Sequence, residues 1–188
     1  MQGISLRLRD HALPPSPHPA PASPIAVIVM GVSGCGKSTL GALLAQALDA
    51  PFLEGDAFHS DEAVAKMRAG HALTDDDRWP WLDRLGAAAA AAVTAQGAAV
   101  VACSALRHAY RARLRAAIDA PVRFILLENS REQLLARLVA RPHHYMPVSL
   151  LDSQLATLER PLPDEDALAL TTDASPDALR DAALAWLR

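Results

Sequence analysis

The feature that most constrains this chain is a glycine-rich stretch between two apolar segments. It reads Gly31-Val32-Ser33-Gly34-Cys35-Gly36-Lys37-Ser38, which is the pattern G-x-x-x-x-G-K-S. Residues 25–30 before it are an unbroken apolar run of strand length, and residues 39–48 after it carry apolar residues at helical spacing. A buried strand, a tight turn and a helix are the context in which this pattern binds nucleotide phosphate. The alternative is a glycine-rich turn that binds nothing.

The residue types of this loop suit phosphate chemistry. Glycines let the backbone approach an anion closely, and successive N–H groups then point at it from the positive end of the following helix. Lys37 would place a cation on the β- and γ-phosphates, and the hydroxyl of Ser38 can reach a Mg²⁺ ion. We therefore expect residues 31–38, together with Thr39, to bind the nucleotide. Cys35 is either a small loop residue or a thiol made reactive by the helix N-terminus.

Composition favours one folded domain, with or without a tail. The chain has 188 residues, of which 51% are hydrophobic and 21% are charged, and its net charge is −3. A nucleic-acid surface normally needs a strongly basic face, so we expect no nucleic-acid partner. No apolar run has the length of a membrane span, so we expect no membrane association. The two cysteines make no disulfide framework, which fits a reducing cytoplasm.

Residues 1–24 differ in composition from the rest of the chain. Residues 14–24 are a tract of proline, alanine and serine, in which the prolines lack N–H donors and hold extended conformations. We therefore expect residues 1–24 to be a disordered extension, with a proline-motif docking segment as the alternative. Residues 25–188 then form the folded domain.

Strand and helix patterns alternate from residue 25 to the end. We expect strands at residues 25–30, 51–54, 98–103, 122–127 and 167–170. We expect helices at residues 39–48, 60–70, 79–96, 108–118, 130–140, 149–158 and from 176 onward. In the helix at 108–118 the arginines, Arg111 among them, should point outward. This order predicts an α/β fold of three layers, in which helices flank a five-stranded parallel sheet. Ligands of such sheets bind outside the carboxyl ends of the strands.

Asp56 follows the second strand, which we expect to lie beside the strand that precedes the glycine-rich loop. Phosphoryl transfer to an alcohol needs a group that accepts or orients the hydroxyl proton, and a carboxylate does this. Asp56 could also hold Mg²⁺ through water; the alternative is that it only caps a turn. His59, three residues on, either contacts the substrate or lies next to a helix cap.

Residues 68–81 carry charges and two tryptophans. Arg68 and Arg78 are candidate clamps for an anionic substrate. The three carboxylates at 75–77 could suggest a metal site, but such a run is more typical of a solvated helix N-terminus, where negative charge suits the helix dipole. Trp79 and Trp81 either anchor a helix in the core or line a pocket.

The segment after the third strand, residues 103–107, lacks the acidic residue that many nucleotide-hydrolysing enzymes carry there. An ATPase that only activates water is therefore disfavoured, and Ser104 and Arg107 suit hydrogen bonds to a polar substrate. Further on, residues 137–147 break between two helices and contain Arg137 and Arg141. An arginine that closes over a transferring phosphate stabilises its charge; the alternative is a surface residue.

Six blocks of this sequence occur together in one known family. They are residues 31–38, 52–59, 66–70, 73–81, 102–107 and 150–154. With them the chain resembles the bacterial gluconate kinases of the P-loop type, relatives of shikimate and nucleoside monophosphate kinases. The blocks 56–59 and 78–81 are more specific than the phosphate loop. The resemblance covers residue 25 to the end.

The resemblance implies ATP-dependent phosphorylation of D-gluconate to 6-phospho-D-gluconate with Mg²⁺, by a homodimer in which residues 137–147 form a helical, mobile lid. Combining it with the motifs, we expect Lys37, Asp56 and Arg137 to be catalytic, and Arg137 also to contact ATP. We expect Ser38 and Asp56 to hold Mg²⁺. The expected contacts of gluconate are Asp56, His59, Arg68, Arg78, Ser104, Arg107 and His144.

Two competing hypotheses stay open from the residues alone. The chain could be a P-loop kinase for another small acceptor, such as shikimate or a nucleotide. It could also be an ATP-binding module without turnover, for which the missing acidic residue after the third strand is the support.

Overall fold

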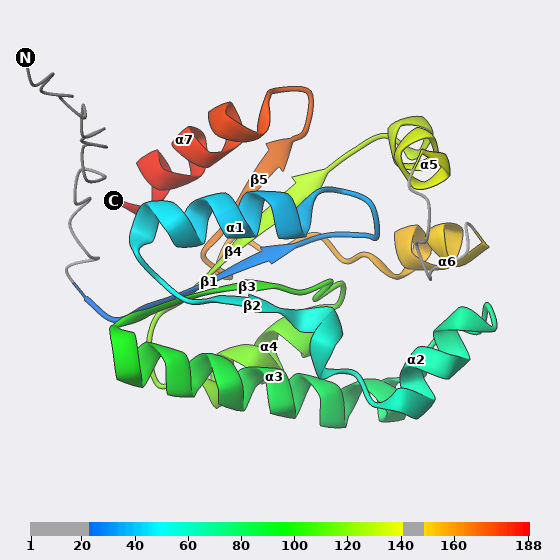
Figure 1. Ribbon diagram of the computed structural model, residues 1–188, viewed down its shortest axis with the longest axis horizontal. Helices are drawn as coiled ribbons and strands as arrows, with labels where there is room; N and C mark the ends of the chain where they lie inside the picture. The colour runs from blue at the N-terminus through cyan, green and yellow to red at the C-terminus, as the bar shows by residue number, and fades with distance from the viewer. Residues whose placement is uncertain (1–22, 141–148) are drawn as a thin grey trace, which may run out of the picture.

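All five expected strands are present in the computed structural model, which describes residues 23–140 and 149–188. They are β1 (Ile25–Met30), β2 (Phe52–Glu54), β3 (Ala98–Ala102), β4 (Val122–Glu128) and β5 (Ala167–Thr171). They form one sheet in the order β2-β3-β1-β4-β5, and every neighbouring pair is parallel (Figure 1). The predicted five-stranded parallel sheet is confirmed.

Helices cover both faces of this sheet, which confirms the predicted three layers (Figure 1). On one face lie α1 (Lys37–Leu48) and α7 (Pro176–Leu187); on the other lie α3 (Asp75–Gln96) and α4 (His108–Ala117). Toward the carboxyl ends of the strands lie the 3-10 helix η1 (Gly55–Phe58), α2 (Asp61–Arg68), α5 (Arg131–Val139) and α6 (Ser149–Thr157). None of the described helices combines the length and the apolar character that crossing a membrane requires.

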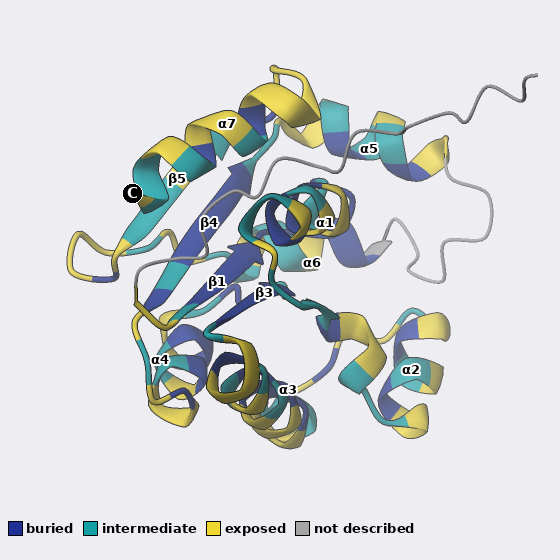
Figure 2. Ribbon diagram, turned by 60° about the vertical axis from the view of Figure 1, so that its left-hand side comes forward, coloured by how far each residue is buried: buried dark blue, intermediate teal, exposed yellow. Residues whose placement is uncertain are grey.

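The two faces of β1 supply both halves of the core. Ala26, Ile28 and Met30 pack toward α3 and α4, whereas Val27 and Val29 pack toward α1 and α7. All five side chains are fully buried, and Figure 2 shows β1 and β4 as buried along most of their length. Because helices cover both faces of a parallel sheet, its strands are apolar without alternation. This is why continuous apolar runs located them correctly.

The long helix α3 begins at Asp75, four residues before the predicted start at residue 79. The side chain of Thr74 accepts a hydrogen bond from the N–H of Asp77, and the carboxylate of Asp77 accepts one from the N–H of Thr74. This reciprocal cap lets the helix begin before Pro80 rather than at the tryptophans that flank it. The three carboxylates at 75–77 form the first turn, as expected for a helix N-terminus.

Strand β2 lies at the edge of the sheet and pairs with β3, so the predicted position of the Asp56 strand beside β1 is wrong. The neighbours of β1 are β3 and β4, and all five residues of β3 are buried. β2 has three residues, all only half-buried. A short, half-buried strand suits the edge, whereas a fully apolar one needs neighbours on both sides.

Arg111 does not point outward as predicted but is fully buried. Its Nε lies 2.6 Å from Oε1 of Glu165, a residue that is itself 1% exposed. Helical periodicity assigns an arginine to the solvent side, but the partner that makes burial possible lies 54 residues further along the chain.

Candidate active site

The phosphate loop (residues 31–38) has the backbone that its glycines permit. Gly31, Gly34 and Gly36 have positive φ angles of 136°, 83° and 106°. A Cβ at Gly31 would also lie 2.9 Å from both Sγ of Cys35 and the carbonyl oxygen of Leu127, so a side chain there is excluded twice. Helix α1 begins immediately after Gly36, at Lys37, and its free N–H groups therefore face the loop. The ammonium of Lys37 donates to the carbonyl of Val32 at 3.0 Å.

Next to the phosphate loop lies a hollow of about 690 Å³ that opens to solvent, which we call the acceptor cavity because residues predicted to contact the acceptor line it. Six of the residues predicted from sequence line it: Ser33, Lys37, Asp56, His59, Arg78 and Ser104. They come from the phosphate loop, the start of α1, η1 and the segment beyond it, α3, and the segment after β3. The ammonium of Lys37, which could bind phosphate, and the carboxylate of Asp56, which could bind a hydroxyl, therefore line the same cavity.

A second hollow of about 600 Å³ also borders the loop, and we call it the nucleotide hollow because residues predicted to bind the nucleotide line it. Gly34, Cys35, Gly36 and Thr39 line it together with Arg137. Arg137 Nη1 donates to the carbonyl of Cys35 at 3.3 Å, and Nη2 donates to Oγ1 of Thr172 at 3.2 Å. The predicted catalytic arginine thus lies beside the phosphate loop and lines the nucleotide hollow.

Asp56 is exposed in η1, and two contacts of Gly55 place it. A Cβ at Gly55 would lie 2.4 Å from the carbonyl oxygen of Ala102, so β3 and η1 approach as closely as only glycine allows. Trp81 Nε1 donates to the carbonyl of Gly55 at 2.7 Å. Trp81 is 2% exposed and also lines the acceptor cavity, so it combines the two functions that its sequence context left open.

His59 stacks on Trp81, with ring centroids 4.2 Å apart and planes inclined by 16°. Burial, with the charges of Arg84 and Arg78, outweighs the opposite effect of Asp56 and lowers the pKa of His59 to about 4. Its Nδ1 is buried without a hydrogen-bond partner in the described part of the chain. His59 is therefore a neutral ring at the cavity wall that can accept or donate one hydrogen bond.

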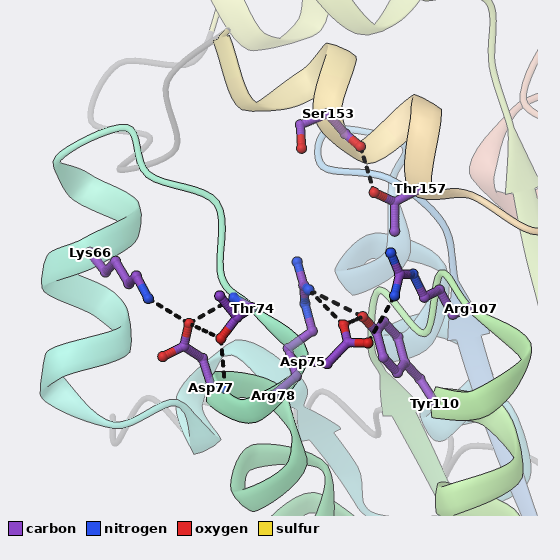
Figure 3. A network of polar contacts seen from close by, with 9 residues as sticks. All are labelled: Lys66, Thr74, Asp75, Asp77, Arg78, Arg107, Tyr110, Ser153 and Thr157. Carbon is purple, nitrogen blue, oxygen red and sulfur yellow. Dashed lines mark hydrogen bonds and ion pairs between the residues drawn. The ribbon is translucent and has the colours of Figure 1, made fainter.

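A network around Asp75 holds two of the predicted arginines, Arg78 in the cavity wall and Arg107 next to it (Figure 3). One carboxylate oxygen of Asp75 accepts from Tyr110 Oη at 2.5 Å and lies 3.5 Å from Arg78 Nη1; the other accepts from Arg107 Nη1 at 2.8 Å. Arg78 Nη1 also donates to Tyr110 Oη at 3.1 Å. The hydrogen bond from Tyr110 and the charges of Arg107 and Arg78 hold the pKa of Asp75 below its usual value. Asp75 therefore fixes two guanidinium groups side by side.

Several residues of this site carried no prediction. Tyr110 lines the acceptor cavity, as do Ser153, Gln154 and Thr157 of α6. Oε1 of Gln154 accepts from the N–H of Ser33 at 2.6 Å, which joins α6 directly to the phosphate loop. The polar residues at 153 and 157, one helical turn apart, were the available signal, but an exposed helix face has the same spacing.

Two residues predicted to contact gluconate, Arg68 and Arg107, do not line the acceptor cavity, and neither does the predicted Mg²⁺ ligand Ser38. Arg107 is held by Asp75 next to the cavity, and Arg68 is exposed in the last turn of α2. Ser38 is exposed in the first turn of α1. His144 lies outside the described residues, as do residues 141–147 of the predicted lid. The first residues of the predicted lid form the C-terminal end of α5.

The donor atoms near the loop fit Mg²⁺ better than a transition metal. Within residues 23–140 and 149–188 there is no cluster of three or more His, Cys, Asp or Glu that could hold a metal ion. Mg²⁺ binds through one or two protein oxygens and completes its shell with phosphate and water. The hydroxyl of Ser38 and the carboxylate of Asp56 are oxygen donors of this kind.

Burial raises the pKa of the Cys103 thiol to about 12, which makes this cysteine inert.

Comparison with known proteins agrees with this geometry. The family profile described as AAA domain matches residues 27–161. A gluconokinase from Gluconobacter oxydans is 44% identical over 156 residues, which cover 83% of this chain and 87% of that protein. The chain belongs to the gluconokinase family. A probable gluconokinase from Schizosaccharomyces pombe is 38% identical over 152 residues, 78% of this chain and 79% of that protein.

A solved structure leads to the same family. The chain is similar to a gluconokinase from Sinorhizobium meliloti 1021, with a TM-score of 0.77 and 41% identity over 87% of this chain and 91% of that one. The acceptor cavity described above is therefore the candidate active site of a gluconokinase-family enzyme that uses ATP.

Proposed function

We propose that this enzyme transfers the γ-phosphoryl group of ATP to the primary hydroxyl of D-gluconate, which yields 6-phospho-D-gluconate. One observation carries the proposal beyond family membership: Asp56 and Lys37 line the same cavity. A kinase needs a carboxylate at the acceptor hydroxyl and a cation at the donor phosphate within one space. The nucleotide hollow has a separate set of lining residues, which leaves this cavity for the acceptor.

The residues divide the chemistry between them. The N–H groups of residues 31–38 and the ammonium of Lys37 bind the β- and γ-phosphates and stabilise the charge that spreads over the transferred group. Asp56 accepts or orients the proton of the attacking hydroxyl. Arg137, which lies beside Cys35, stabilises charge from the nucleotide side. The hydroxyl of Ser38 and the carboxylate of Asp56 would hold Mg²⁺, and the bound ion would neutralise charge on the phosphates.

The far wall of the acceptor cavity suits the rest of a sugar acid. Arg78 offers a guanidinium for the carboxylate. Ser104, Ser153 and Thr157 offer hydroxyls, and neutral His59 offers a ring nitrogen, for the polyol. Arg68, Arg107 and His144 complete the proposed contacts. We also propose a homodimer in the cytoplasm, a lid over residues 137–147 and a separate N-terminal extension at residues 1–24; these rest on the family resemblance and on composition.

A coupled assay of ADP release tests the proposal, with D-gluconate, shikimate and AMP offered separately. We expect strong stimulation by gluconate and none by the other two. Formation of 6-phosphogluconate, followed through its NADP-dependent dehydrogenase, would identify the product. Absence of gluconate-stimulated ADP release would overturn the proposal, and stimulation by shikimate or AMP would assign another acceptor.

A further inference from the structure

The segment after β3, residues 103–107, is held at three consecutive carbonyl groups. The carbonyl of Ser104 accepts from the N–H of Gly31 at 3.2 Å, that of Ala105 from Arg111 Nη1 at 3.1 Å, and that of Leu106 from the N–H of Glu159 at 2.8 Å. The three donors belong to the phosphate loop, to α4 and to the segment after α6. This short segment is therefore tied to three separate parts of the fold.

Ala105, in the middle, has a left-handed backbone with φ at +43°. A residue with a Cβ rarely adopts this conformation, and it persists only where the surroundings force it. The backbone of Ala105 matters for the site because it sets the directions of its two neighbours. Both of them, Ser104 and Leu106, line the acceptor cavity. The wall that they form depends on the backbone of Ala105.

Arg111 is the side chain that binds the carbonyl of Ala105. It is fully buried and does not line the cavity. Its Nε and Nη2 donate to Glu165 at 2.6 and 2.9 Å, and its Nη1 donates to the carbonyls of Ala105 and Glu159. Glu165 is 1% exposed and also accepts from the N–H of Leu162 at 2.7 Å. Because this buried guanidinium donates four hydrogen bonds to Glu165 and to two carbonyl groups, its position is fixed.

We propose that Arg111, fixed by its pairing with Glu165, is a positioning residue for the acceptor: it keeps Ala105 left-handed and so aims Ser104 and Leu106 into the cavity. The inference rests on the proposed function only in taking this cavity as the site of gluconate. If the ion pair between Arg111 and Glu165 contributed only to stability, its loss would lower the stability of the fold without raising KM for gluconate more than KM for ATP.

The test replaces both charges by apolar residues of similar size, Arg111→Met with Glu165→Leu, since replacing both partners of a buried pair avoids leaving one charge unpaired. We expect KM for gluconate to rise about tenfold or more, because small displacements of positioning groups have effects of this size, while KM for ATP changes less than about twofold. Arg113→Met is the matched control: Arg113 lies on the same helix and pairs with Asp83 at 2.6 Å, but on the surface. It should leave both KM values unchanged.

Two further variants keep the test decisive. Arg111→Lys keeps the charge but lacks the fork that reaches Glu165 and Ala105 together, so it should show the same selective rise if the double variant does not fold. Ala105→Gly, combined with the double variant, should restore most of the affinity for gluconate, because glycine adopts positive φ without support. A merely structural pair would give no such rescue.

A crystal structure of the double or the Arg111→Lys variant supplies a readout that does not depend on activity. We expect residue 105 to leave the left-handed region. Retention of φ near +43° in residue 105 would overturn the inference, as would an unchanged KM for gluconate in an active variant. These outcomes differ from a failure of the proposed function, which would appear as the absence of gluconate turnover by the unaltered enzyme.

Discussion

The proposed nucleotide half and the proposed acceptor half of this site are built in different ways. In the nucleotide half, the phosphates are held by eight consecutive residues, 31–38, whose backbone N–H groups and glycine conformations follow from local sequence, with Arg137 as a distant addition. The acceptor half draws its side chains from the segment after β2, from α3, from the segment after β3, and from α4 and α6, which the chain reaches between residues 56 and 157. Backbone recognition needs only a short motif, whereas side-chain recognition needs the whole fold to bring its parts together.

The largest effect that separates the halves should come from Asp56→Asn. The amide keeps the size of the carboxylate but cannot take the hydroxyl proton, so we expect kcat to fall about 10²- to 10⁴-fold. Affinity for ATP, measured by calorimetry, should stay within about twofold, since P-loop contacts hold the phosphates. Asp76→Asn, an exposed residue in the first turn of α3, is the control and should behave like the unaltered enzyme. A normal kcat in Asp56→Asn would remove the proposed proton acceptor.

Arg137→Gln should act on the nucleotide side. The variant loses the guanidinium that contacts the carbonyl of Cys35 and Thr172. We expect KM for ATP to rise about tenfold, the size of effect that loss of one charge-assisted hydrogen bond produces, with a smaller change in KM for gluconate. Initial rates over a grid of both substrates measure the two constants. A rise confined to KM for gluconate would contradict the assignment of Arg137 to the nucleotide half.

Tyr110→Phe should act on the acceptor side with a smaller effect. Without its hydroxyl, Asp75 and Arg78 lose the group that joins them, so Arg78 is less well placed for a carboxylate. We expect KM for gluconate to rise about fivefold, the equivalent of about one neutral hydrogen bond, and KM for ATP to stay constant. Together with Arg137→Gln this variant gives a reciprocal pair. Equal rises in both constants would show that the two halves are not independent.

The smallest effect concerns pH and His59. Its pKa is about 4 in the folded chain and 6.5 ordinarily, so between these values the unfolded chain binds a proton that the folded chain does not. Stability should therefore be fully present above about pH 6.5 and fall as the pH drops toward 4. The pKa of Glu165 is also low, because hydrogen bonds from Arg111 and Leu162 outweigh the effect of burial, but it titrates below its ordinary 4.5.

Urea unfolding between pH 4.5 and 6.5 isolates the contribution of His59 from that of Glu165. We expect a midpoint that increases with pH in this window, and a weaker increase in His59→Phe, which keeps a ring to stack on Trp81. An identical pH dependence in both proteins would show that His59 is not the group responsible.

The parts of the fold predicted correctly are those with local causes. Apolar runs located the five strands, and the serine caps at residues 60, 130 and 175 are observed with their side chains accepting hydrogen bonds. The predicted start of α3 at residue 79 is wrong because the cap at Thr74 begins the helix one turn earlier and the helix continues through Pro80. Asp56 could be selected because any residue that directly follows a parallel strand lies at the ligand edge.

By itself, the sequence determined the phosphate loop, the strands and helices, and the family. A glycine pattern, an apolar run or a cap acts through neighbours only a few residues away, so it can be read directly. Only the tertiary structure decided that β2 lies at the edge, that Arg111 is buried against Glu165, and that Asp75 holds Arg78 and Arg107 beside Tyr110. These depend on partners tens of residues away, and whether a charged side chain meets water or an opposite charge is settled only when the chain is packed.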